Sequence, residues 1–286
     1  MAGGADRLTV TFLGVRGSRP APDARLSGYG GNSPCVGVAL GGSRLILDAG
    51  TGIASAPEAF WHGGATHVFL THLHHDHICG LMFYRAFYDQ ACEVVVHAPS
   101  GGEVFLKAYW ESPYFPIPFA KAAAGARIVP VNDGDAFVVQ ASRPGRAGDG
   151  ESLLVEAMAL DGRIHPEQGV LVYRVTGGGR RVVYATDVEL ADEVSKRRVA
   201  AFAKDADLLI LDAHFTDEEY AACAGWGHNS VSMALEVGTL AECRRLILFH
   251  HHPERPDDAL RALEARVRER LAHAAFAREG AVVEIE

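Results

Sequence analysis

The sequence lacks the features of an exported, membrane-embedded or general nucleic-acid-binding protein. Its apolar runs fall well short of the roughly 20 residues that a membrane-spanning helix needs, and its first residues lack the basic head and apolar stretch of a signal peptide. Basic residues are outnumbered, with 27 Lys and Arg against 36 Asp and Glu, which gives a formal net charge of −9. An extended surface for nucleic-acid backbones, which depends on clustered Lys and Arg, is therefore not expected.

Cysteine is also scarce, with five residues and no C-x-x-C pair. An odd, scattered set argues against a disulfide framework, so we expect reduced thiols in a soluble, cytoplasmic protein. Cys79, close to a histidine-rich run, is expected to be a small buried side chain rather than a metal ligand. The cysteines are Cys35, Cys79, Cys92, Cys223 and Cys243.

The chain has 286 residues, of which 48% are hydrophobic, and this is enough for a large core within one domain. Short β-rich runs alternate with glycine-rich turns in both halves, and helical spacing appears between some of them. Residues 141–150 are expected to form a turn and residues 112–118, rich in proline, a loop. We find no internal domain boundary, so residues 1–286 are expected to form one domain. The predicted strands are residues 8–13, 35–40, 44–47, 66–70, 93–97, 137–140, 153–157, 171–175, 181–185, 208–211 and 246–249, and the predicted helices begin after Gly80 and span residues 230–242 and 257–272.

The most informative segment is His72-x-His74-x-Asp76-His77, which follows a predicted buried strand. His72 and His74 can reach one cation from a loop that has just left the strand, whereas Asp76 and His77 indicate a second position nearby. Imidazole and carboxylate ligands fit zinc, manganese or iron, with zinc favoured. The segment therefore predicts two divalent metal ions.

This segment resembles the signature of the metallo-β-lactamase superfamily. Three earlier segments, Leu13-Gly14-Val15-Arg16-Gly17-Ser18, Tyr29-Gly30-Gly31-Asn32-Ser33 and Asp48-Ala49-Gly50-Thr51-Gly52, are similar to those of bacterial cyclic-phosphate and cyclic-nucleotide phosphodiesterases, with tRNA 3′-processing endonucleases as close relatives. The resemblance implies an α/β fold of four layers, αββα, in which two mixed sheets pack face to face between outer helices.

The resemblance also implies the remaining ligands. His72 and His74 need a further ligand, and His165 occupies the position of the superfamily's third histidine. Asp187 looks like its bridging carboxylate, and the second metal would then take Asp76, His77, Asp187 and His250. We prefer His250 to His251 and His252 because it directly follows a predicted strand, and we expect the other two to lie exposed in a loop.

A second constellation is predicted further along the chain, where His228 precedes a helix within Gly227-His228-Asn229-Ser230. This segment resembles the loop of the phosphodiesterases and tRNA endonucleases whose histidine serves the phosphate and the leaving group. Asp212, at the end of its own strand, would orient His228, although the endonucleases usually carry a glutamate there. His214 is a weaker candidate.

In the mechanism that these residues suggest, hydroxide shared by the two metals is the nucleophile and Asp76 is the general base. Asp48 resembles the superfamily's early aspartate, which implies that it braces the site loop without binding metal. Arg16 and Asn32 either reach a substrate phosphate or tie loops together, and the sequence does not decide between these roles.

The leading hypothesis from the sequence is a dinuclear-metal phosphodiesterase that hydrolyses a small cyclic phosphate or cyclic nucleotide. The first alternative is tRNA 3′ processing, against which stand the acidic charge and the lack of a basic, Gly/Pro-containing insertion. The second is hydrolysis of a carboxyl ester, lactone or β-lactam, which makes less use of a poised acid such as His228. The expected partner is a small phosphodiester. No membrane partner is expected, and a homodimer is compatible with the sequence.

Overall fold

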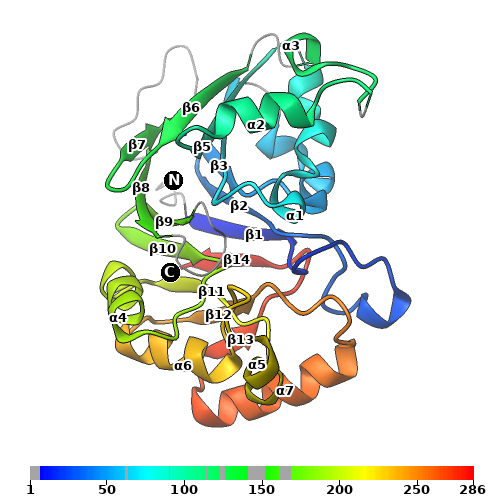
Figure 1. Ribbon diagram of the computed structural model, residues 1–286. Helices are drawn as coiled ribbons and strands as arrows, with labels where there is room; N and C mark the ends of the chain where they lie inside the picture. Colours follow the sequence, from blue (N-terminus) through cyan, green and yellow to red (C-terminus); the bar gives the residue numbers. More distant parts are fainter. Residues whose placement is uncertain are drawn as a thin grey trace, which may run out of the picture.

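The computed structural model describes residues 7–61, 64–89, 91–113, 115–122, 126–140, 152–161 and 169–286. Two sheets, each with seven strands among these residues, pack face to face, and helices cover their outer faces (Figure 1). This architecture confirms the four-layer αββα fold that the sequence predicted. None of the described helices is long and apolar enough to cross a membrane.

The first sheet has the strand order β14-β1-β2-β3-β4-β5-β6. Its strands are antiparallel from β14 to β3 and parallel from β3 to β6, so the sheet is mixed. The strands are β1 (Leu8–Gly14), β2 (Cys35–Leu40), β3 (Ser43–Leu47), β4 (Gly64–Phe69), β5 (Cys92–Pro99), β6 (Arg127–Val131) and β14 (Val282–Ile285).

The second sheet has the order β13-β12-β11-β10-β9-β8-β7 and is also mixed. Strands β10 to β13 are parallel, whereas β7 to β10 are antiparallel. The strands are β7 (Ala136–Val139), β8 (Leu153–Leu160), β9 (Val170–Gly177), β10 (Arg180–Ala185), β11 (Leu208–Asp212), β12 (Leu246–Phe249) and β13 (Ala274–Phe276).

Helices α1 to α3 lie in the half of the molecule that holds β4 and β5, and α4 to α7 lie in the half that holds β11 and β12 (Figure 1). Several short 3-10 helices complete the connections. The α-helices are α1 (His75–Ile78), α2 (Gly102–Tyr109), α3 (Phe119–Ala122), α4 (Glu193–Phe202), α5 (Asp217–Cys223), α6 (Val231–Leu240) and α7 (Asp257–Arg270), and the 3-10 helices are η1 (Ala24–Leu26), η2 (Thr51–Ser55), η3 (Glu58–Phe60), η4 (Leu81–Phe83) and η5 (Arg85–Tyr88).

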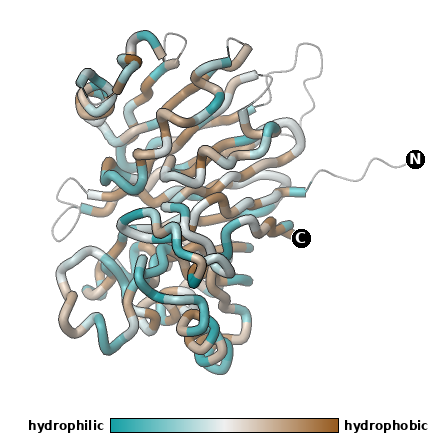
Figure 2. Tube along the Cα trace, turned by 90° about the vertical axis from the view of Figure 1, so that its right-hand side faces the viewer, coloured by the Kyte–Doolittle hydropathy of each residue, from teal (hydrophilic) through white to brown (hydrophobic). Residues whose placement is uncertain are grey.

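The central core lies between the two sheets. Strand β1 alternates buried and partly buried residues, as expected for a strand with one face on a core. Its Phe12 packs against Phe249 of the other sheet, with ring centroids 6.2 Å apart, and Tyr184 packs against Phe249 at 5.6 Å. Burying such a side chain contributes roughly 1.5–3 kcal/mol. Figure 2 shows hydrophobic residues along the central strands and hydrophilic residues in many of the outer loops.

The parallel register of β10, β11 and β12 brings polar residues to one edge of the second sheet. Ala185 pairs with Leu211, and Leu211 pairs with Leu248. The residues that follow these strands therefore emerge side by side, as the carboxyl ends of parallel strands do in other α/β folds.

Most predicted strands agree with the structure to within a few residues, and the hairpin of β9 and β10 is confirmed. The helix predicted after Gly80 is wrong. Two short 3-10 helices lie there instead, because Tyr84 between them has an extended backbone and buries its ring, with its hydroxyl 2.7 Å from that of Thr66. The predicted turn at residues 141–150 lies outside the described residues.

Candidate metal centre

The first group of donors follows β4, where the chain leaves the sheet and turns into α1. His74 is the N-terminal cap residue of α1, and Asp76 and His77 lie in its first turn. The rings of His72 and His74 are 4.3 Å apart between centroids, and those of His72 and His77 are also 4.3 Å apart. Because α1 is only four residues long, the motif places all these side chains on one side of the strand end.

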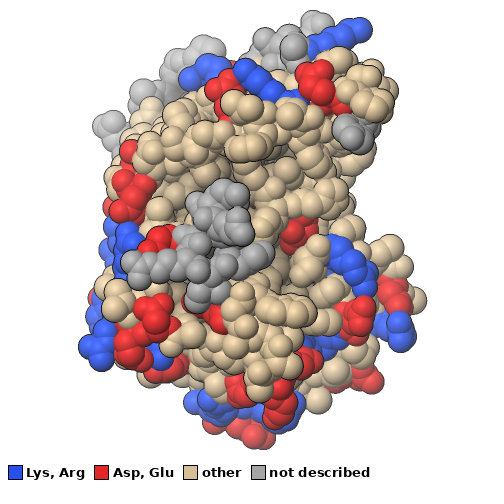
Figure 3. Space-filling model, in the orientation of Figure 1, with Lys and Arg blue, Asp and Glu red and all other residues tan. Residues whose placement is uncertain are grey.

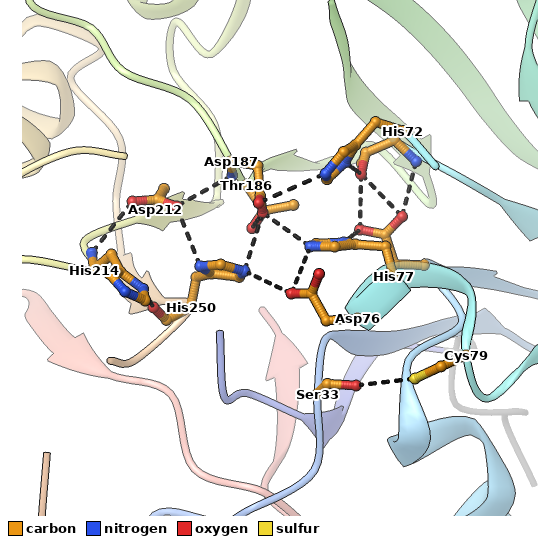
Figure 4. Close-up of polar contacts among 12 residues, drawn as sticks. Ser33, His72, Asp76, His77, Cys79, Thr186, Asp187, Asp212, His214 and His250 are labelled. Atoms are coloured by element: carbon orange, nitrogen blue, oxygen red, sulfur yellow. Dashed lines mark hydrogen bonds and ion pairs between the residues drawn. The ribbon is translucent and has the colours of Figure 1, made fainter. Parts of the chain in front are cut away.

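Asp187, which follows β10, lies between the donors of the two sheets (Figure 4). Its Oδ1 is 3.6 Å from His72 Nε2, and its Oδ2 is 3.0 Å from His77 Nε2. Oδ2 is also 3.2 Å from His250 Nε2. Burial alone would raise the pKa of Asp187, but the surrounding imidazoles, first of all His250, hold it well below its usual value. A carboxylate between donors from both sheets is suited to bridging two cations.

His250 follows β12 and completes the second group of donors. Its Nε2 is 3.3 Å from Asp76 Oδ2, and the same oxygen is 3.3 Å from His77 Nε2. Three residues of the site have left-handed backbones: Asp48 with φ 58°, Asp187 with φ 53° and His250 with φ 63°. Such conformations cost about 1–3 kcal/mol for residues other than glycine and persist only when their surroundings hold them.

Asp48 holds the first ligand loop in place. Its Oδ1 accepts from the backbone N–H of Thr71 at 2.8 Å, and its Oδ2 is 2.8 Å from His77 Nδ1. Tyr184 of the other sheet donates to the same Oδ2 at 2.9 Å. The second contact fixes the His77 ring so that Nε2 faces Asp187, as outer carboxylates do for metal-binding histidines. The expected bracing role of Asp48 agrees with this geometry.

His228 and Asp212 form the predicted pair. His228 Nδ1 is 2.9 Å from Asp212 Oδ2, and that oxygen also accepts from the backbone N–H of Asp187 at 3.1 Å. The His228 ring stacks on that of His250, with centroids 4.8 Å apart. Burial works against its charge, but the Asp212 carboxylate outweighs burial and raises the pKa of His228 to about 9. Cations bound at Asp187 and Asp76 would lower this value toward neutrality.

The residues present fit divalent metal ions. His72 Nε2 and His77 Nε2 are buried without a hydrogen-bond partner among the described residues, an arrangement that a cation would satisfy. Within the described part of the chain, donor atoms within 4.8 Å of one another form four groups. Two of these groups contain His228, so His228 is also a candidate metal ligand. The groups are His72, His74 and Asp187; Asp76, His77 and His250; Asp187, Asp212, His228 and His250; and His214, His228 and His250.

His165, the predicted third histidine of the first metal, lies outside the described residues. Cys79 points away from the cluster toward Ser33, whose hydroxyl is 3.7 Å from its sulfur (Figure 4). Ser230 is the N-terminal cap residue of α6. The position of Cys79 agrees with its expected structural role.

Arg16 is fully buried and ties loops together instead of presenting its charge to a substrate. Its guanidinium donates to the backbone carbonyl of Gly30 at 2.7 Å and to those of His252 and Arg255 at 3.1 and 3.0 Å. Burial lowers the pKa of Arg16 to about 10, so it remains a cation at neutral pH. This geometry favours the second of the two roles considered for Arg16.

Asn32 likewise ties loops, because its side-chain amide donates to Glu279 at 2.7 Å. His251 was expected to lie exposed, and this is wrong. It is fully buried, and its Nε2 is 2.8 Å from the carbonyl of Ala277, because the chain after β12 continues as a bridge beside Arg16. His252 is partly exposed.

Several residues of the site escaped the sequence analysis. Thr71 contacts both Asp48 and His72 Nδ1, the latter at 3.0 Å. The sequence signal for Thr71 was its position directly before the segment His72-x-His74-x-Asp76-His77. Tyr184 and Glu189 carried no such signal, because their contacts join segments far apart in the chain.

A cavity of about 570 Å³ opens beside Asp187, and its lining is acidic. Five carboxylates and a single arginine, Arg198, are among its lining residues. A phosphodiester would be repelled by such a lining unless cations neutralised it. The carboxylates belong to Asp133, Asp161, Asp187, Glu189 and Asp192.

Comparisons with known proteins agree with this geometry. Residues 43–251 match the family model described as a beta-lactamase superfamily domain. A ribonuclease Z from Natronomonas pharaonis is 30% identical over 278 residues, which cover 85% of this chain and 86% of the relative. A ribonuclease Z from Gemmatimonas aurantiaca is 27% identical and covers 97% of this chain and 96% of its own.

Solved structures share the fold at lower identity. The metallo-beta-lactamase fold protein YhfI from Bacillus subtilis has a TM-score of 0.69 and 19% identity over 98% of this chain and 99% of its own. The short form of human tRNase Z has a TM-score of 0.65 and 19% identity over 97% and 99%. Zinc-bound PqqB from Methylobacterium extorquens has a TM-score of 0.66 and 16% identity over 96% and 99%. The family model and the ribonuclease Z relatives show that the chain belongs to the metallo-β-lactamase superfamily and is a metal-dependent hydrolase.

Proposed function

We propose that this chain hydrolyses phosphodiesters and that its substrate is the 3′ region of an RNA. The observation that carries phosphodiester hydrolysis is the contact between His228 and Asp212 beside the predicted metal ligands. The choice of RNA is supported by the name ribonuclease Z of relatives that match about 85% of both chains. We propose zinc as the metal, with manganese or iron as alternatives, because the ligands are imidazoles and carboxylates.

The residues divide the chemistry between them. Two bound divalent ions would supply an activated water and neutralise the charge on the phosphoryl oxygens. His72, His74 and His165 would hold the first ion, Asp187 would bridge, and Asp76, His77 and His250 would hold the second. Asp76, whose Oδ2 lies 3.3 Å from both His77 Nε2 and His250 Nε2, would also accept a proton from the attacking water.

His228 would protonate the leaving alkoxide. Because its Nδ1 donates to Asp212, Nε2 is the ring atom that can deliver a proton. Asp212 is itself held by the backbone N–H groups of Asp187 and Asn229, at 3.1 and 3.0 Å. The acid and the bridging ligand are therefore positioned by one carboxylate.

A second candidate substrate is a small cyclic phosphate or cyclic nucleotide. The net charge of −9 favours it, because RNA backbones bind to clustered cations. On the face in Figure 3, Lys and Arg of the described residues alternate with Asp and Glu around the edge and do not form a broad basic patch. A small substrate needs only the local charge of the metal ions.

The test is hydrolysis by purified protein reconstituted with zinc or manganese. The substrates are a precursor tRNA with a 3′ trailer, 2′,3′- and 3′,5′-cyclic nucleotides, bis(p-nitrophenyl) phosphate, and a lactone or β-lactam. Cleavage of the precursor supports the RNA substrate, and turnover confined to cyclic nucleotides supports the second candidate. Turnover confined to the lactone or lactam would overturn phosphodiester hydrolysis.

Two variants test the assignments within the site. Asp187→Ala should lose both bound metal and activity, because it removes the bridging carboxylate. His228→Ala should keep its metal and lose about 10²–10⁴-fold in turnover of a substrate with an alkoxide leaving group. Metal content by mass spectrometry decides whether His228 is a ligand: loss of one ion per chain in His228→Ala would overturn its role as the acid.

A further inference from the structure

One carboxylate joins the segment after β10 to the loop that carries His228. Glu189, two residues after Asp187, accepts a hydrogen bond from the hydroxyl of Tyr220 at 2.6 Å. It also accepts from the backbone N–H of Gly225 at 2.8 Å and from that of Gly227 at 2.8 Å. Oε1 receives the first two bonds and Oε2 the third, so both oxygens are engaged.

The backbone of the loop is shaped for this carboxylate. Gly225 and Gly227 have φ values of 89° and 87°, a left-handed conformation that is readily accessible only to glycine. Left-handed residues of this kind turn backbone N–H groups toward one point and form concave sites for anions. Here the anion is a side chain of the protein itself. Trp226, between the two glycines, is 62% exposed, so apolar packing does little to hold this part of the loop.

Two other contacts join the same segments closer to the site. The backbone N–H of Leu190 donates to Asn229 Oδ1 at 2.8 Å, and that of Asp187 donates to Asp212 Oδ2 at 3.1 Å. The first contact lies on the C-terminal side of His228 in the chain, and the second lies beside its ring. Glu189 supplies the attachment on its N-terminal side, where residues 224–226 are exposed.

We propose that Glu189 is a positioning residue for His228. By fixing Gly225 and Gly227 to the segment that begins with Asp187, it sets the distance between the proton donor and the bridging ligand. The inference rests on the proposed function, because it assumes that His228 protonates a leaving alkoxide. Glu189 itself touches neither the predicted metal ions nor the leaving group in this scheme.

The experiment compares two phosphodiesters in the metal-loaded enzyme. Thymidine 5′-(p-nitrophenyl) phosphate has a leaving group that needs no acid, whereas a dinucleotide releases a ribose hydroxyl. Glu189→Ala should lower the ratio of dinucleotide turnover to p-nitrophenyl ester turnover about 10–100-fold, part of the 10²–10⁴-fold effect of a general acid. The ratio is the readout because Glu189 also lines the cavity beside Asp187, where loss of its charge acts alike on two phosphodiesters that each carry one negative charge. Glu189→Gln should fall between, because one of its two acceptor oxygens becomes a donor that faces a backbone N–H.

The matched control is Glu193→Ala, a glutamate four residues further on whose side chain is 62% exposed and bonds to Lys196 and Arg197 of its own helix. It should leave the ratio of the two rates unchanged. An equal loss on both substrates in Glu189→Ala would overturn the proposal, because it would indicate a general structural effect.

A second measurement is independent of turnover. Hydrogen exchange of the amides of Gly225 and Gly227 should be faster in Glu189→Ala than in Glu193→Ala, and the Nδ1–H resonance of His228 should broaden or vanish. Unchanged exchange and an unchanged resonance would overturn the proposal. If the wild-type protein hydrolyses no phosphodiester, the precursor tRNA and the cyclic nucleotides included, the proposed function fails, while these two signals still decide whether Glu189 holds His228.

Discussion

At the scale of single residues, the side chains behind the predicted ligands are as informative as the ligands. Asp48 contacts the Thr71 backbone, His77 and Tyr184 with one buried carboxylate. The carboxylate accepts every one of these bonds. An amide cannot replace this carboxylate. Its nitrogen would face His77 Nδ1, and two N–H donors would then point at each other.

We therefore predict that Asp48→Asn lowers metal affinity and turnover by about 10–100-fold, the usual effect of altering the partner of a metal-binding histidine. Competition with a chromogenic chelator measures the affinity. Asp23→Asn, which alters an exposed carboxylate bonded to Arg25, is the control. An affinity equal to that of the wild type would show that Asp48 does not orient His77.

A histidine pair away from the metal centre, in which His97 is buried and His67 is partly buried, predicts sensitivity to acid. His97 stacks on Phe69, with centroids 3.9 Å apart, and its Nε2 is 3.0 Å from His67 Nδ1. Burial and the neighbouring imidazole lower the pKa of His97 from 6.5 to about 3. His97 therefore gains a proton below pH 6.5 in the unfolded chain. In the folded protein it gains this proton only near pH 3.

Stability should accordingly fall as the pH drops below 6.5, by about 2 kcal/mol at pH 5 from His97 alone. His97→Phe keeps an aromatic ring against Phe69 and removes the titrating group. Urea unfolding at pH 5 and pH 7 should show a smaller difference for His97→Phe than for the wild type. Equal differences would contradict the assignment of the acid sensitivity to His97.

At the scale of elements, the end of β1 and the chain after β12 form one unit with Arg16 at its centre. Backbone hydrogen bonds of Gly17 and of His251 cross this junction. They help to hold His250 in its left-handed conformation. Removal of the Arg16 guanidinium would leave the buried carbonyls of Gly30 and Arg255 without their donor, whereas the His252 carbonyl would keep the backbone N–H of Arg255 at 3.1 Å.

Each buried acceptor without a partner costs about 1–3 kcal/mol. We predict that Arg16→Met lowers the free energy of unfolding by about 3 kcal/mol or more and that Arg16→Lys recovers only part of the loss. Denaturant unfolding of metal-loaded protein measures both. A variant Arg16→Met as stable as the wild type would show that water or rearranged loops satisfy the carbonyls.

The elements that could be predicted from the sequence are those with a strong local signal. Apolar β-rich runs identified the strands, and the polar residues directly after them identified Asp187, Asp212 and His250. The helix predicted after Gly80 failed because Tyr84 is buried by contacts with Thr66 and Phe60, which no periodicity shows. The burial of Arg16 and the role of Glu189 depend on segments far apart in the chain, so the sequence could not assign them.

At the scale of the whole molecule, the metal centre joins the two sheets. His72 and His77 follow β4 of the first sheet, whereas Asp187 and His250 follow β10 and β12 of the second. Bound cations would link these sheets and stabilise the folded state, because the unfolded chain does not assemble the ligands.

We predict that removal of metal by a chelator lowers the melting temperature by roughly 10 °C, which corresponds to about 4 kcal/mol at a metal concentration a thousand times the Kd. Scanning calorimetry before and after zinc is restored measures the shift. Asp187→Ala should melt at one temperature with or without zinc. A wild-type melting temperature that is the same with and without metal would contradict a link between the sheets.

The left-handed backbones of Asp48, Asp187 and His250 have a consequence for protein engineering. Local backbone preference favours glycine or asparagine at these positions, so a redesign that rewards expression or thermal resistance alone would tend to replace all three. The resulting protein would be easier to produce and inert. Libraries built from this chain should therefore keep these codons fixed and seek gains elsewhere.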